Sequence, residues 1–147
     1  MTLFNRLLLA IDLSPAADHL LSRVHKFCYD HMDRVHVVHV LRSDFILAEE
    51  SDGGTGALAA EQKRLKDQAS VSLSEILVRN GFNISANRIV IRAGEPATEI
   101  KRLAHDLEAD LVIVGSHNRD SGWLNLPGAT TNCVLQGIQS DVMAVRV

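Results

Sequence analysis

Residues 7–14 read LLLAIDLS, a continuous apolar run that ends at Asp12. A strand that is covered on both faces needs apolar side chains on both sides, so its sequence is continuous rather than alternating. Pro15 follows, and proline suits the first position of a helix. The stretch therefore predicts a buried strand over Leu7 to Ile11 and then a helix that Ser14 caps.

Four further apolar runs repeat this pattern along the chain. They read VHVVHVL (residues 35–41), RIVIR (residues 88–92), LVIV (residues 111–114) and VMAVRV (residues 142–147). Apolar residues at helical spacing lie between the runs, over residues 15–28, 57–79, 96–107 and 129–138. Strands that alternate with helices indicate βαβ units. We therefore expect an α/β fold with an open, five-stranded, mostly parallel sheet and helices on both faces, which is a doubly wound, Rossmann-like arrangement.

Composition narrows the class of protein. The 147 residues contain no internal repeat and suit a single domain over 1–147. Hydrophobic residues make up 46% and charged residues 22%, which is typical of a globular chain. The net charge is -3 and the basic residues are scattered, which argues against a nucleic-acid partner. No apolar run reaches the roughly 20 residues that a membrane helix needs.

Cysteine usage and the N-terminus bear on location. The two cysteines, Cys28 and Cys133, cannot form a disulfide framework. The first residues lack the pattern of a signal peptide. We therefore expect a cytoplasmic protein that contacts neither nucleic acid nor a membrane.

Residues suited to ligand binding follow several of the predicted strands. In open α/β sheets, ligands bind beyond the carboxyl ends of the strands, where the strand order reverses. The residues expected at this edge are Asp12, Val40, Gly115, Ser116, His117, Asn118, Gly128, Ala129 and Thr130. Glycines let a backbone approach a ligand closely, and helix N-termini attract phosphate. The arrangement suits a nucleotide-sized anion, although the phosphate-binding patterns GxGxxG and GxxxxGK[ST] are absent.

These residues carry a family likeness. Over essentially its whole length, the chain resembles the universal stress protein family. The likeness rests on LLLAIDLS (residues 7–14), His39-Val40, Gly94-Glu95-Pro96, LVIVGSH (residues 111–117), and Gly128 with the closing strand. It implies the doubly wound fold of that family and a role in the stress response.

The family's nucleotide-binding pattern, Gly-x2-Gly-x9-Gly-(Ser/Thr), is matched in part. Gly115 and Gly128 occupy the first and third positions, whereas Asn118 and Ala129 replace the second glycine and the hydroxyl residue. Asparagine tolerates a left-handed backbone, but its side chain takes space near the phosphate. The lost hydroxyl removes a hydrogen bond that contributes roughly 0.5–1.5 kcal/mol. Thr130 follows directly, and backbone donors remain, so the pattern predicts a degenerate site that binds weakly.

The resemblance also assigns contacts for ATP or AMP. Asp12 and the Val40 backbone would hold adenine and ribose, and Gly115 would pack against the ribose. Phosphate would meet mainly backbone donors. The full set of expected site residues is Ala10, Asp12, Val40, Gly115, His117, Asn118, Gly128, Ala129 and Thr130. No metal is expected beyond Mg²⁺ carried by the nucleotide.

Catalytic sets are not visible in the sequence. Ser14 and Ser116 lack a GxSxG elbow. As metal ligands, His36 and His39 cannot chelate one ion together, because their odd offset places them on opposite sides of a strand. His117 is interpreted as a residue that orders the loop or borders the ligand. We therefore expect binding rather than enzymatic turnover.

The closing strand predicts a partner. An apolar edge strand over Val142–Val147 invites pairing, and the family pairs this strand with its twofold copy. Asp141 resembles a branch of the family that lacks the nucleotide pattern and does not bind ATP. Two hypotheses therefore stand: a homodimeric adenine-nucleotide sensor, or a nucleotide-free scaffold that acts only through protein association.

Overall fold

All five strands of the sheet run parallel in the computed structural model, which describes residues 3–42, 55–116, 133–134 and 136–147. The strand order is β3-β2-β1-β4-β5. Their bounds are β1 Leu7–Ala10, β2 Val35–Arg42, β3 Ile89–Gly94, β4 Leu111–Ser116 and β5 Asp141–Arg146. The predicted doubly wound α/β sheet is confirmed, with strand ends that differ from the predicted ones by one to two residues.

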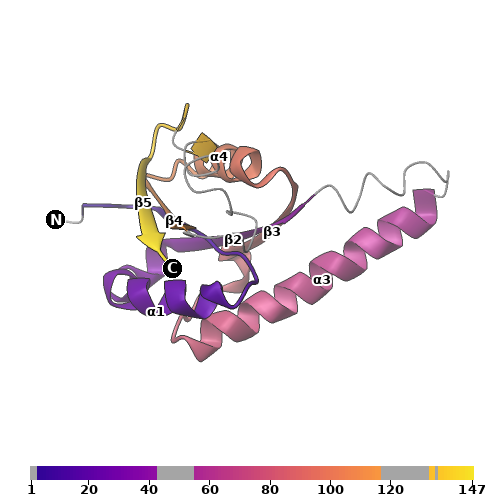
Figure 1. Ribbon diagram of the computed structural model, residues 1–147, viewed down its shortest axis with the longest axis horizontal. Coiled ribbons are helices and arrows are strands. Elements are labelled where there is room, and N and C mark those ends of the chain that lie inside the picture. Colours follow the sequence, from indigo (N-terminus) through magenta and orange to yellow (C-terminus); the bar gives the residue numbers. More distant parts are fainter. Residues whose placement is uncertain (1–2, 43–54, 117–132, 135) are drawn as a thin grey trace.

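Helices cover both faces of this sheet. Helix α4 lies against one face, and α1 and α3 lie against the other (Figure 1). The bounds are α1 Ala16–Tyr29, α3 Thr55–Arg79 and α4 Pro96–Asp106, with short 3-10 turns at Met32–Arg34 and Ala86–Arg88. The N-terminal half of α3 extends beyond the sheet (Figure 1).

Two apolar layers hold the helices to the sheet. Along β1, Leu7 and Leu9 pack toward α1 and α3, whereas Leu8 and Ala10 pack toward α4. This alternation explains why the strand sequence is apolar at every position. The predicted helical stripe of α1 is confirmed, because each of its members is buried: Ala17, Leu20, Leu21, Val24 and Cys28.

Helix ends follow local chemistry. Asn80 and Gly81 end α3 as predicted: Gly81 has a φ of +80°, and the N–H of Phe82 donates to the carbonyl of Leu77 at 2.8 Å. The predicted cap of α1 is displaced by one residue, since Pro15 occupies the N-cap position in place of Ser14. Ser14 still contributes, because its hydroxyl accepts a hydrogen bond from the Ala16 N–H.

The last predicted helix, 129–138, is wrong at its C-terminal end. Residues 133–134 are helical, and Val134 is buried, but Gln136 and Gly137 form a turn. Gly137 has a φ of +76°, which ends helical geometry before Ile138. Ile138 nevertheless packs on the α4 side of the sheet. Residues 129–132 and 135 lie outside the described residues.

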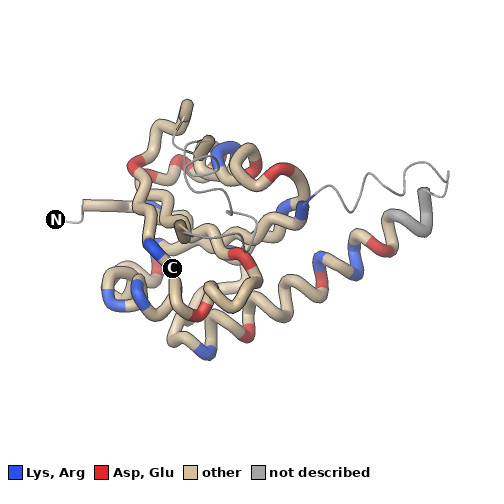
Figure 2. Tube along the Cα trace, viewed as in Figure 1, with Lys and Arg blue, Asp and Glu red and all other residues tan. Residues whose placement is uncertain are grey.

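Charged residues of both signs are interspersed over the described chain rather than gathered on one face (Figure 2). Among the described residues, no helix combines the length and the apolar character that crossing a membrane requires.

Candidate functional site

The strand order reverses between β1 and β4. From β1, the chain adds β2 and β3 on one side and β4 and β5 on the other. The register pairs Leu9 with Ile113, so the carboxyl ends of the two strands finish side by side. Such a reversal is where open α/β sheets bind ligands.

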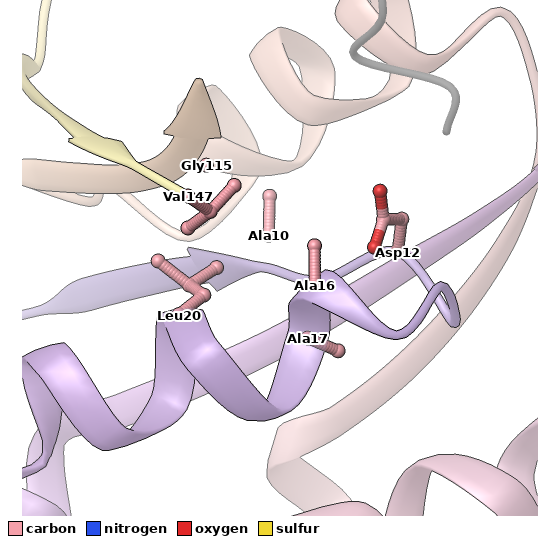
Figure 3. Close-up of a pocket in the computed structure, with 7 residues that line it drawn as sticks. All are labelled: Ala10, Asp12, Ala16, Ala17, Leu20, Gly115 and Val147. Atoms are coloured by element: carbon pink, nitrogen blue, oxygen red, sulfur yellow. The ribbon is translucent and has the colours of Figure 1, made fainter. Parts of the chain in front are cut away.

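A small pocket lies at this point. It is lined by Ala10, Asp12, Ala16, Ala17, Leu20, Gly115 and Val147. Figure 3 shows Asp12 at one end of it and Leu20 with Val147 at the other. The pocket has a volume of about 10 Å³, which is space for about one water molecule. This pocket alone is therefore too small for a nucleotide-sized ligand.

Leu20 and Val147 fill the space beside Gly115. A Cβ atom on Gly115 would lie 3.5 Å from a Val147 methyl carbon and 3.6 Å from a Leu20 methyl carbon. Both distances are ordinary van der Waals contacts. The packing of the described residues around this position would accept the methyl group of an alanine.

Asp12 shapes the turn that follows β1. The side chain is buried, and its Oδ1 accepts hydrogen bonds from the Ser14 N–H (3.2 Å) and the Ser14 hydroxyl (2.6 Å). The Ser14 hydroxyl in turn accepts from the Ala16 N–H. Asp12 thus orders the entry to α1, and it also brings a carboxylate to the edge of the pocket.

His39 is a buried polar residue in an apolar strand. Its Nδ1 lies 2.8 Å from the carbonyl oxygen of Ile11, and because a carbonyl only accepts, Nδ1 must carry the proton. Burial lowers the pKa of His39, and the bond to Ile11 and the charge of Asp12 oppose this shift only in part. The imidazole is therefore neutral near pH 7.

The structure brings together three of the predicted site residues, Ala10, Asp12 and Gly115, in one pocket. Val40 lies on β2, the strand next to β1, and does not line that pocket. The other five predicted residues, His117, Asn118, Gly128, Ala129 and Thr130, lie outside the described residues.

Sequence reasoning missed His39 as a site residue, because it weighed the histidine only as a metal ligand. The signal that could have found it is a histidine in an apolar strand, directly before Val40. Within the described ranges, no group of three or more His, Cys, Asp or Glu side chains is arranged to hold a metal ion.

A larger groove lies away from this edge. It runs between α4 and residues 136–141, with a volume of about 1110 Å³. Its walls mix Lys101 and Arg102 with Asp106 and Glu108. Mixed charge does not select an anion, so the strand reversal remains the better candidate despite its smaller pocket.

Comparison with known proteins agrees with this fold. The model of the universal stress protein family matches residues 3–146. Universal stress protein A homolog 2 of Coxiella burnetii is 28% identical over 145 residues, which cover 98% of this chain and 96% of that protein.

Solved structures share the fold. The hypothetical protein MJ0577 superposes with a TM-score of 0.70 at 22% identity, covering 99% of this chain and 98% of that one. A universal stress protein in complex with cAMP gives 0.60 at 15% identity, with 99% and 98% covered. The universal stress protein from Archaeoglobus fulgidus in complex with dAMP gives 0.54 at 16% identity, with 98% and 99% covered.

Proposed function

We propose that this chain, which belongs to the universal stress protein family, binds an adenine nucleotide such as ATP or AMP and acts in the stress response by binding rather than by catalysis. It would do so as a single-domain homodimer in the cytoplasm. The observation that carries the proposal is the meeting of Asp12 and Gly115 at the strand reversal. Two structural neighbours that were solved with cAMP and dAMP support the choice of adenine.

The adenine would lie against the carboxyl end of β2. The backbone of Val40 offers one N–H donor and one C=O acceptor, in a fixed order. Adenine presents the complementary pair, N1 as acceptor and the 6-amino group as donor, whereas guanine presents donor and acceptor in the opposite order. We therefore expect AMP to bind more tightly than GMP.

The ribose would face Asp12 and Gly115. A carboxylate accepts hydrogen bonds only, so Asp12 suits the hydroxyl groups of a sugar. Gly115 would present its backbone closely to the ribose. The phosphate would meet Asn118, Gly128, Ala129 and Thr130, with His117 beside it, as the family pattern implies. Any Mg²⁺ would arrive bound to that phosphate.

The dimer would form through β5. This strand is at the edge of the sheet and pairs only with β4 among the described strands. The N–H groups of Asp141 and Val147 donate to carbonyls of the β4 side. Because alternate residues of a strand direct their backbone groups to opposite sides, the N–H groups of Val142, Ala144 and Arg146 point outward. Such an edge can pair with a second copy.

A nucleotide-free scaffold is the second candidate. Asn118, Ala129 and Asp141 favour it, because they depart from the pattern of the nucleotide-binding members. In this case, β5 and other surfaces would carry the whole function through protein association.

Calorimetry separates the two candidates. Protein that is purified without added nucleotide is titrated with AMP, ATP and GMP. Saturable heat with the adenine nucleotides and weaker binding of GMP supports the sensor. If millimolar AMP and ATP produce no heat, the result supports the nucleotide-free scaffold.

A further inference from the structure

We infer that His39 is a positioning residue for the proposed nucleotide site: it occupies the Ile11 carbonyl and so keeps the Val40 N–H available for the base. The inference rests on the proposed function, because it assigns a cause to the hydrogen-bonding edge of Val40 that the adenine would use. His39 itself need not touch the ligand.

The β1–β2 ladder ends one hydrogen bond early. Its last residue pair is Ala10 with Val38, and the Ile11 N–H still donates to the Val38 carbonyl at 2.9 Å. In a regular parallel ladder, the next bond would run from the Val40 N–H to the Ile11 carbonyl. In the described part of the chain, no such backbone bond is formed.

The imidazole takes the place of that missing bond. His39 Nδ1 donates to the Ile11 carbonyl at 2.8 Å, so the carbonyl has a partner without Val40. His39 is 6% exposed, and Val40 is 1% exposed. A buried backbone N–H without an acceptor costs free energy. A ligand atom that accepts a hydrogen bond from the Val40 N–H would therefore stabilise this end of the strand.

The direction of the Val40 backbone groups supports the same inference. Val38 uses its carbonyl toward β1, so Val40, two residues on, also directs its N–H and C=O toward the β1 side. At that point β1 has left the ladder and turned into the segment that carries Asp12. The backbone edge of Val40 and the Asp12 turn therefore lie at the same end of β1.

The test uses two substitutions of nearly equal shape. His39→Asn keeps an N–H donor near the position of Nδ1, and His39→Leu removes it. His36→Ala is the matched control, since His36 lies three residues earlier on β2 and on the opposite face. AMP affinity is measured by calorimetry, and urea unfolding corrects each value for the folded fraction.

The expected result follows from the loss of one positioned donor. His39→Leu should bind AMP about 10-fold more weakly, whereas His39→Asn should stay within about 3-fold of the wild type. His36→Ala should bind like the wild type. Equal affinity of His39→Leu and wild type, or equal losses in the Leu and Asn variants, would overturn the inference.

A second measurement works without nucleotide. The NMR coupling across a hydrogen bond between Val40 N and the Ile11 carbonyl carbon should be absent in the wild type and present in His39→Leu, where the carbonyl is released. If the wild type binds no nucleotide but this coupling appears, the proposed function fails and the backbone role of His39 stands. If the coupling is already present in the wild type, or does not appear in the variant, the inference itself is wrong.

Discussion

Asp12 and Gly115 line one pocket, although Asp12 follows β1 and Gly115 lies in β4. They meet because β1 and β4 are hydrogen-bonded neighbours at the point where the strand order reverses. The account of function depends on this meeting, because it brings a carboxylate and a glycine backbone to one edge.

Asp12→Asn should weaken AMP binding without loss of the fold. The asparagine carbonyl can still accept the hydrogen bonds from Ser14, so the turn into α1 is kept. The charge that would bind the ribose hydroxyls is lost, and hydrogen bonds to charged groups contribute more than neutral ones. We expect about 10-fold weaker binding by calorimetry, with an unchanged far-ultraviolet circular dichroism spectrum. Wild-type affinity in the variant would place the ribose elsewhere.

Gly115→Ala and Gly94→Ala should differ in stability. The new Cβ at Gly115 meets only ordinary contacts, whereas Gly94 has a φ of +150° and its Cβ would lie 2.9 Å from Glu99 Cγ. We expect a change within about 0.5 kcal/mol for Gly115→Ala and a loss of about 1–3 kcal/mol for Gly94→Ala. Urea unfolding measures both. The opposite order of the two losses would contradict the geometry described for these two glycines.

Stability should fall as pH drops below about 6.5, in part through His39. The pKa of His39 is lowered in the folded protein, so between the folded and unfolded pKa values the unfolded chain binds a proton that the folded chain does not. Unfolding is then favoured by acid, by up to about 1.4 kcal/mol per pH unit. His39→Asn removes this group, and its unfolding free energy should depend less on pH between about 7.5 and 5.5. If the unfolding free energy of His39→Asn and of the wild type depends equally on pH, then His39 has the same pKa in the folded and the unfolded chain. The pKa of His36 is also lowered by burial, and this contribution is common to both proteins.

Ala144→Pro should yield monomers if β5 pairs with a second copy. The Ala144 N–H points away from β4, so proline removes an outward donor and leaves the β4–β5 ladder intact. Val145→Pro is the matched variant, because its N–H points toward β4 and its loss should destabilise the subunit itself. Sedimentation should give twice the chain mass for the wild type and a single chain mass for Ala144→Pro. A dimer that survives Ala144→Pro would move the interface away from this edge.

Much of the fold follows from local sequence pattern. Continuous apolar runs predicted all five strands. The 3.6-residue spacing of Leu20, Leu21 and Val24 predicted the buried face of α1. Both predictions succeed because the faces of an element that are buried determine the spacing of its apolar residues. The end of the last helix was wrong, since a left-handed glycine such as Gly137 can end a helix before its apolar pattern does. The N-cap of α1 lies at Pro15 rather than at Ser14, because local propensity does not decide between two adjacent cap positions.

The candidate site could be predicted only in part. The strand ends that carry Asp12 and Gly115 follow from the topology of a doubly wound sheet. The hydrogen bond from His39 to Ile11 depends on the register of β1 against β2 and on the residue pair at which their ladder ends. Register results from tertiary packing between segments far apart in the chain, so no local pattern reveals it.

The most direct test of the central claim is an NMR titration of the isotope-labelled chain with AMP. The account predicts saturable shifts of the backbone amides of Val40, Leu13 and Gly115. Val40 and Gly115 lie near the carboxyl ends of β2 and β4, and Leu13 lies in the turn that follows β1. GMP should produce smaller shifts at the same ligand concentration. Shifts confined to the groove between α4 and residues 136–141, or no shifts at millimolar AMP, would contradict it.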